Sequence, residues 1–234
     1  MIRTAVVTGA TRGIGRAISE QLIHGGTRVF LLARSHYELA EFSKTLGELA
    51  VPVVCDLRDE QAVADAVEKI SEFTQGAPDI VVNNAGLFPL APLHIMAVAT
   101  FEQTLEVNVV APFRFIRAFL PLMRGRKTGH IVTIGSVADR QIFPENGAYA
   151  ASKHAQRAMH EVLRQELQGT GVRASIVSPG PTDTSIWNEI DPDHRDGFPN
   201  RRNMLRASAV ASAVLWVIDA PADMNVDELR ISRT

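Results

Sequence analysis

Short runs rich in valine and isoleucine alternate with helical stretches along the chain, and this alternation constrains the fold more than any other feature. Alternating β and α segments with apolar strands are typical of a parallel sheet that helices cover on both faces. The sequence therefore predicts an α/β fold with one doubly wound parallel sheet. The predicted strands are residues 4–8, 28–33, 51–55, 80–83, 130–134 and 172–177, with 226–232 as an edge strand.

The length of the chain predicts one domain over residues 1–234. With 234 residues, of which 46% are hydrophobic, the chain is long enough for one well-buried core and short for two. One stretch, residues 185–203, contains prolines and a glycine and shows neither helical nor strand periodicity. We expect this stretch to form a mobile lid over a site.

Charge and hydropathy argue against nucleic acid and membranes as partners. The net charge of −2 gives no general attraction to nucleic acid or to anionic membranes. No apolar stretch approaches the ~18–20 residues of a membrane helix, and none precedes the first predicted strand. The single cysteine, Cys55, cannot form an internal disulfide and is expected to be a small core residue. These features predict a cytoplasmic protein.

A glycine-rich turn follows the first predicted strand and leads into a helix expected over residues 14–24. It reads Gly9-Ala10-Thr11-Arg12-Gly13-Ile14-Gly15. Glycines allow tight backbone angles and close approach of a phosphate, whose charge is favoured by the N-terminus of a helix. The spacing differs from the Gly-x-Gly-x-x-Gly fingerprint of dinucleotide sites. The turn by itself therefore predicts a phosphate site without naming the ligand.

Tyr149 and Lys153 lie four residues apart in a segment expected to be helical, so both side chains share one face. A phenol is a poor acid or base at neutral pH, because its unperturbed pKa is about 10. A neighbouring ammonium favours the phenolate and lowers the pKa of the phenol toward the working range. The pair predicts proton transfer, with an ordinary surface contact as the alternative.

Pro112 lies four residues after Asn108, inside a helix expected from about residue 100 to residue 120. Because proline has no N–H, the carbonyl of Asn108 loses its donor within the helix, and the proline ring kinks the helix there. A carbonyl freed in this way can hold a water molecule. A kink that serves packing alone is the alternative.

Six motifs, taken together and in this order, resemble the short-chain dehydrogenase/reductase family over nearly the whole chain. The resemblance implies a Rossmann-type fold and hydride transfer between a nicotinamide cofactor and a small-molecule carbonyl or secondary alcohol. It also implies a homodimer or homotetramer formed through the helices expected over residues 101–120 and 148–168. The motifs are Thr8 to Gly15, Asn83-Asn84-Ala85-Gly86, Asn108, Ser136, Tyr149-x-x-x-Lys153 and Pro179-Gly180.

The resemblance assigns catalytic roles to Asn108, Ser136, Tyr149 and Lys153. Tyr149 would protonate the carbonyl oxygen during reduction and take the proton back during oxidation. Lys153 would lower the pKa of Tyr149 and hold the ribose of the nicotinamide, while Ser136 would hydrogen-bond the substrate oxygen. The main-chain oxygen of Asn108 would hold a water that links Lys153 to solvent. Judged by itself, Ser136 fits a turn at a strand end equally well.

Arg34 stands where an acidic residue would bind the ribose 2′-hydroxyl of NAD. Its guanidinium suits a 2′-phosphate, and Arg12 supplies a second cation, so NADP is favoured and NAD is less likely. The alternative is that Arg34 stacks on the adenine without selecting the cofactor. The complete set of predicted cofactor-binding residues is Gly9, Thr11, Arg12, Gly13, Ile14, Gly15, Arg34, Asp56, Leu57, Asn83, Ala85, Gly86, Tyr149, Lys153, Pro179, Gly180, Thr182 and Thr184.

Two of these cofactor residues have specific expected partners. By resemblance, Asp56 would accept a hydrogen bond from the adenine amino group, and Thr184 would bind the nicotinamide amide. A cap for the following helix is the alternative role of Asp56. No residue pattern predicts a metal site.

The predicted substrate-binding residues are Ser136, Phe88, Phe143 and Trp187. This largely apolar set suits an apolar or aromatic carbonyl compound, or its alcohol. Two other functions remain open. A 3-oxoacyl carrier-protein reductase is disfavoured because the chain ends without the Val-Asp-Gly-Gly segment of many such enzymes. A non-catalytic NADP-sensing protein is disfavoured because the catalytic side chains are intact.

Overall fold

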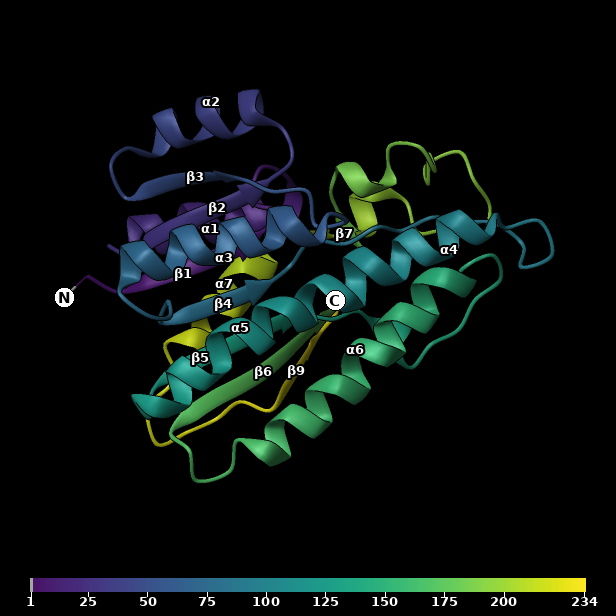
Figure 1. Cartoon of the computed structure of the whole chain (residues 1–234). Coiled ribbons are helices and arrows are strands. Elements are labelled where there is room, and N and C mark those ends of the chain that lie inside the picture. The colour runs from purple at the N-terminus through teal and green to yellow at the C-terminus, as the bar shows by residue number, and fades with distance from the viewer. Residues whose placement is uncertain (1) are drawn as a thin grey trace.

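The computed structural model describes residues 2–234. They form a seven-stranded sheet with helices packed around it (Figure 1). The strand order is β3-β2-β1-β4-β5-β6-β9, and every neighbouring pair is parallel. The predicted doubly wound sheet is confirmed. Its order reverses between β1 and β4, which opens a crevice at the carboxyl ends of these strands. The bounds are β1 (Thr4–Thr8), β2 (Arg28–Ala33), β3 (Ala50–Val54), β4 (Ile80–Asn83), β5 (Gly129–Ile134), β6 (Val172–Pro179) and β9 (Glu228–Ile231).

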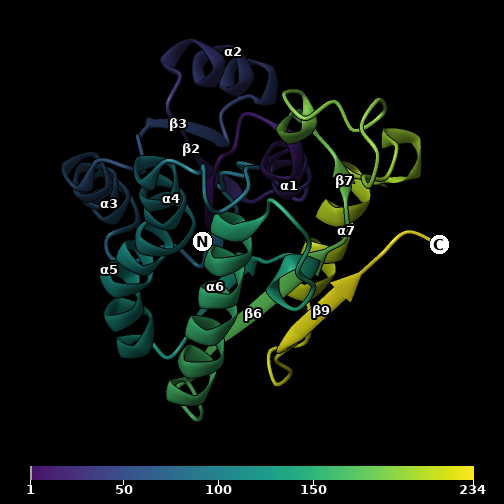
Figure 2. The ribbon, with the colours of Figure 1, turned by 90° about the vertical axis from the view of Figure 1, so that its right-hand side faces the viewer.

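Helices cover both faces of this sheet (Figures 1 and 2). Alternate strand residues point to opposite faces, so Val6 joins one apolar core and its neighbour Val7 joins the other. This double burial explains why the strands are apolar throughout. None of the helices in residues 2–234 is long and apolar enough to cross a bilayer. One core includes α1 (Gly13–His24), α2 (His36–Leu46) and α7 (Ala207–Ile218), and the other includes α3 (Glu60–Thr74), α5 (Ala111–Gly125) and α6 (Gly147–Glu166).

Four strands differ from their predicted bounds. β5 begins one residue earlier than predicted, at Gly129, and β9 spans Glu228–Ile231 instead of residues 226–232. β3 is shifted by one residue, which leaves Cys55 just beyond it, buried in the core. Burial raises the pKa of the Cys55 thiol to about 12, as expected for an inert core residue. β6 is two residues longer than predicted because β9 pairs with Ser178 and Pro179.

The long helix around Asn108 consists of three parts. α4 (Val98–Leu105) leads into a π-helical turn, η1 (Glu106–Val110), and then into α5. The prediction of a helix over residues 100–120 was therefore too short at both ends, since the helical path continues through Pro121 to Gly125. Asn108 lies in the middle of the π turn, so the distortion expected from Pro112 takes this form. Such turns are frequent at functional sites.

The segment predicted as a lid, residues 185–203, contains two short 3-10 helices, η3 (Ser185–Trp187) and η4 (Arg201–Asn203). At its base, β7 (Thr182–Asp183) pairs with β8 (Leu205–Arg206). The guanidinium of Arg195 forms an ion pair with Glu145, in the loop before α6. These contacts connect the segment to the body of the protein, and its mobility stays a prediction.

Candidate active site

Four loops meet at the carboxyl edge of the sheet. The hydroxyl oxygen of Thr8, at the end of β1, accepts hydrogen bonds from the backbone N–H groups of Asn84 and Ala85, each over 3.0 Å. On its other side the glycine turn faces the loop after β6, because a Cβ on Gly13 would lie 3.0 Å from a side-chain carbon of Thr184. The motifs that follow β1, β4 and β6 are therefore brought together as predicted, and Ser136 follows β5 at the same edge.

The glycines of the turn are required by close packing and by backbone conformation. A Cβ on Gly15 would lie 2.3 Å from the carbonyl oxygen of Gly9 and 2.3 Å from the side-chain nitrogen Nδ2 of Asn84. Gly9 and Gly13 adopt φ values of +66° and +55°, in the left-handed region that favours glycine. The result is a tight backbone cradle at the N-terminus of α1, where a phosphate binds favourably.

Three polar side chains near the glycine turn have no protein partner in the described part of the chain. Asn83, at the end of β4, is 2% exposed, and neither polar atom of its side-chain amide has a hydrogen-bond partner within residues 2–234. The side chains of Arg12 and Arg34 are exposed, and they form no hydrogen bond or ion pair with any other side chain of residues 2–234. An unmet buried amide and two unpaired cations beside a phosphate cradle fit a dinucleotide that carries an additional phosphate.

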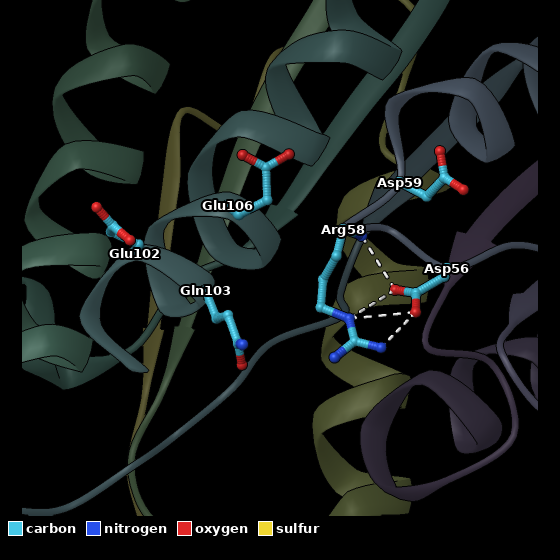
Figure 3. Close-up of a pocket in the computed structure, with 6 residues that line it drawn as sticks. All are labelled: Asp56, Arg58, Asp59, Glu102, Gln103 and Glu106. Carbon is cyan, nitrogen blue, oxygen red and sulfur yellow. Dashed lines mark hydrogen bonds and ion pairs between the residues drawn. The ribbon is translucent and has the colours of Figure 1, made fainter. Parts of the chain in front are cut away.

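Asp56 lies beside a hollow of about 520 Å³, which Figure 3 shows. Arg58 donates hydrogen bonds to both carboxylate oxygens of Asp56, and this contact holds the pKa of Asp56 below its usual value. The alternative role of Asp56 as a helix cap is wrong, because the cap of α3 is Asp59. The adenine contact of Asp56 stays a prediction. The hollow is lined by Asp56, Arg58, Asp59, Glu102, Gln103 and Glu106.

Tyr149 and Lys153 share one face of α6, as their spacing predicts. The Lys153 ammonium lies 5.5 Å from the centroid of the Tyr149 ring, and its side chain is nearly inaccessible to solvent. Ser136 precedes a short 3-10 helix, η2 (Val137–Asp139), and its hydroxyl accepts the backbone N–H of Ala138 over 3.1 Å. Ser136 therefore has the predicted turn role, and this role leaves its hydroxyl proton available to another acceptor.

The carbonyl of Asn108 has a protein partner, and a water at its second lone pair stays a prediction. Pro112 does remove its helical donor, but the side-chain amide of Gln156 donates to this carbonyl instead. The amide oxygen of Gln156 accepts a hydrogen bond from Lys153 over 2.8 Å, and the carbonyl of Ile134 accepts another over 2.8 Å. Sequence reasoning missed Gln156. Its position three residues after Lys153, on the same helical face, was the available signal.

Burial governs the ionisation of the pair. It raises the pKa of Tyr149 to about 12, an effect that Ser136 opposes and the charge of Asp139 reinforces. Burial also lowers the pKa of Lys153 to about 7, which Asp139 opposes. The expectation that Lys153 lowers the pKa of Tyr149 is therefore wrong for this arrangement. The physical reason is that desolvation dominates and that the ammonium of Lys153 is turned toward Gln156 and Ile134.

Asp139 was not predicted as a site residue. It is fully buried in η2, and its carboxylate accepts a hydrogen bond from the hydroxyl of Ser178 over 3.1 Å. Its second oxygen has no partner within residues 2–234. The only signal in the sequence was its position three residues after Ser136, which does not by itself indicate burial.

Aromatic rings form a row above Tyr149. Phe88 packs edge to face against Tyr149, with centroids 4.6 Å apart, and against Trp187, with centroids 5.2 Å apart. Trp187 in turn contacts Phe198, at 6.0 Å. Phe88 and Trp187 were predicted to lie here and Phe198 was not. Phe143, in the loop before α6, makes no ring contact with them or with another aromatic residue of the described chain.

No group of three or more His, Cys, Asp and Glu side chains within residues 2–234 is placed to hold a metal ion. Comparison with protein families adds the deciding observation: the model of short chain dehydrogenases matches residues 3–195. The chain belongs to the short-chain dehydrogenase family. This assignment agrees with the resemblance seen in the sequence and makes the protein an oxidoreductase.

Relatives of this short-chain dehydrogenase match over nearly its full length. An uncharacterized oxidoreductase of Staphylococcus saprophyticus is 33% identical over 233 residues, covering 98% of this chain and 96% of that protein. An alcohol dehydrogenase of the archaeon Thermococcus sibiricus, solved with 5-hydroxy-NADP, has a TM-score of 0.87 and 29% identity, covering 100% of this chain and 97% of the other. A serine dehydrogenase, solved in a closed form with NADP+, has a TM-score of 0.88 and 30% identity, covering 97% and 94%.

Proposed function

We propose that this short-chain dehydrogenase transfers a hydride between NADP(H) and a carbonyl or secondary alcohol substrate, with Tyr149 as the general acid and base. The observation that carries the proposal is the placement of Tyr149 beside the buried ammonium of Lys153, at the sheet edge where the glycine turn lies. Two similar solved structures contain NADP or a derivative of it, which supports the choice of cofactor.

The residues of the cleft suit NADP(H), which supplies the hydride when bound. The backbone of the glycine turn and the N-terminus of α1 would hold the pyrophosphate. Arg12 and Arg34 would bind the 2′-phosphate, because both guanidinium groups lack a protein partner within residues 2–234. The loop that follows Asn83 would lie along the cofactor, and Thr184 would bind the nicotinamide amide.

Tyr149 would supply the proton when a carbonyl is reduced. Its phenol is protonated at neutral pH and would donate to the substrate oxygen, while the raised pKa of about 12 makes it a weaker acid than a free phenol. The hydroxyl of Ser136 would hydrogen-bond that oxygen as charge develops on it. The row of Phe88, Trp187 and Phe198 provides an apolar wall beside Tyr149, so we infer an apolar or aromatic substrate.

Assembly and movement complete the proposal. The chain would act as one domain, with residues 185–203 opening to admit substrate past Trp187. It would form a homodimer or homotetramer, in which α5 and α6 present apolar surface to another copy. Phe113 and Val162 are about half exposed on these helices.

Steady-state oxidation of NADPH and NADH against a panel of ketones, diketones and acyl thioesters tests this function. We expect turnover of apolar or aromatic ketones with a preference for NADPH. Activity confined to acyl thioesters would identify a 3-oxoacyl carrier-protein reductase instead. Tight NADPH binding without turnover of any compound would support a non-catalytic NADP-binding protein and contradict the proposal.

A further inference from the structure

Gln156 connects two groups of the site without reaching the surface. Its side chain is 1% exposed, so every polar atom of the amide requires a partner inside the protein. The amide oxygen accepts from the ammonium of Lys153, and the amide nitrogen donates to the carbonyl of Asn108. The three residues form one buried line that runs from the π turn η1 to the ammonium group.

The orientation of the amide in this line is dictated by its partners. The carbonyl of Asn108 can only accept a hydrogen bond, so the NH2 group of Gln156 must face it and the amide oxygen must face Lys153. The side chain of Asn108 gives no alternative partner, because it already binds the backbone of Leu87 and the hydroxyl of Ser152. Gln156 is therefore held in a single orientation.

An amide in this position acts differently from a water molecule. It accepts a hydrogen bond from the ammonium, but it does not pass protons between its two ends as readily as a mobile water does. We propose that Gln156 is a positioning residue, whose amide takes the place of a water between Lys153 and the Asn108 carbonyl and fixes the ammonium beside Tyr149. Its effect on turnover rests on the proposed function, whereas its effect on Lys153 does not.

Loss of this acceptor disfavours the charged form of Lys153. The pKa of Lys153 is about 7 because burial lowers it, and a hydrogen bond to a charged group is worth roughly one to two units of pKa. Gln156→Leu has a similar volume and no acceptor, so it lowers this pKa further. Gln156→Ala leaves space for water, which accepts from Lys153 and donates to the carbonyl of Asn108, so its effect is smaller.

Other charged groups around Lys153 are the same in all variants. Asp139 of η2 and the phenol of Tyr149 on the same helix face Lys153. Glu106, on the π turn, is paired with Arg114. A difference between wild type and variant therefore reports the contribution of Gln156.

Titration of Lys153 by NMR tests the proposal without any turnover. The chain contains four lysines, so selective ¹³C labelling gives few signals, and Lys153→Arg identifies the one of interest. We expect the midpoint of Lys153 to fall by roughly one to two pH units in Gln156→Leu and by less in Gln156→Ala. Gln165→Leu, at an exposed site on the same helix, is the matched control and should leave the midpoint unchanged.

The pH dependence of kcat gives the second readout. If Lys153 must be charged, the alkaline limb of the profile moves to lower pH in Gln156→Leu and is largely restored in Gln156→Ala. An unchanged Lys153 titration in Gln156→Leu would overturn the proposal. A larger shift of the Lys153 midpoint in Gln156→Ala than in Gln156→Leu would also overturn it, because the variant that loses more packing would then show the larger effect. Absence of turnover in wild type would contradict the proposed function, while the NMR titration would still decide the role of Gln156.

Discussion

The rings of Phe88 and Tyr149 meet edge to face, with 4.6 Å between their centroids. Phe88 lies in the loop after β4, and Tyr149 lies in the first turn of α6, so the contact joins the two walls of the site. It contributes to the burial that raises the pKa of Tyr149 to about 12. Packing against Phe88 therefore helps to make the phenol a weaker acid than it is in water.

We predict that Phe88→Ala lowers the pKa of Tyr149. The chain has two tyrosines, so a Tyr37→Phe background leaves Tyr149 as the sole phenol. At about pH 10 an unperturbed phenol is half ionised, whereas ultraviolet absorbance should show Tyr149 still protonated in this background and partly ionised once Phe88 is replaced. Equal ionisation of both proteins at this pH would show that Phe88 does not bury the phenol.

Replacement of Arg34 by aspartate should reverse the attraction for a 2′-phosphate. A charge-assisted bidentate contact is lost, so NADPH binding should weaken by roughly tenfold to a hundredfold, while NADH binding changes little or improves. Arg34→Lys keeps the charge without the planar fork and should lose less. Quenching of tryptophan fluorescence gives the dissociation constants. If Arg34→Asp leaves the ratio of the NADPH and NADH dissociation constants unchanged, Arg34 does not select the cofactor, and any preference for NADPH comes from Arg12.

The helices α5 and α6 should form an interface between copies of the chain. Phe115, Phe119 and Leu163 on these helices are buried in the core of the chain and are not free to contact another copy. The exposed apolar residues are Phe113, which is 49% exposed, and Val162, which is 57% exposed.

Light scattering should therefore show a dimer or tetramer, and Phe113→Glu or Val162→Glu should shift it toward the monomer, because each places a charge in an apolar contact. Tyr37→Glu, at an exposed position of α2, is the control and should leave the assembly intact. A wild-type mass of only 25.5 kDa at micromolar concentration would rule out the assembly.

The sequence predicted the sheet, the helices and most of the site because their signals are local. Strand periodicity, the glycine turn and the spacing of Tyr149 and Lys153 each lie within a few residues. The role of Gln156 was not visible, because it depends on contact with Asn108, which lies 48 residues away. The ionisation of Tyr149 was predicted in the wrong direction for the same reason. Its ring packs against Phe88, which in turn contacts Trp187, and only the folded chain brings these residues together.

Acid should destabilise the fold through His130. This ring is buried at the start of β5, with Nε2 2.8 Å from the hydroxyl of Ser175. Burial, followed by the charges of Arg173 and Arg3, lowers its pKa to about 3 from an ordinary value of 6.5. As pH falls, His130 therefore binds a proton at a higher pH in the unfolded chain than in the folded chain. The contribution of neutral His130 to the free energy of unfolding is fully present above pH 6.5. It is lost progressively toward pH 3, at about 1.4 kcal/mol per pH unit.

Urea unfolding at about pH 7 and about pH 5 measures this effect. The wild type should lose about 2 kcal/mol from His130 between these conditions. His130→Gln keeps a polar partner for Ser175 and does not titrate, so its loss should be smaller by about that amount. His160, whose pKa burial also lowers, is present in both proteins and cancels in the difference. Equal losses in the two proteins would exclude His130 as the cause.

Transfer of deuterium from NADPH that carries deuterium at both C4 positions of the nicotinamide tests the proposed hydride transfer. A ketone that the panel assay identifies is incubated with wild type and with Tyr149→Phe, which deletes one hydroxyl and keeps the ring. We expect wild type to form an alcohol with one deuterium on its carbinol carbon. Its formation should be slower by roughly 10²–10⁴-fold in Tyr149→Phe, with NADPH affinity retained. Unlabelled alcohol from wild type, or labelled alcohol at the wild-type rate from Tyr149→Phe, would contradict the proposed function.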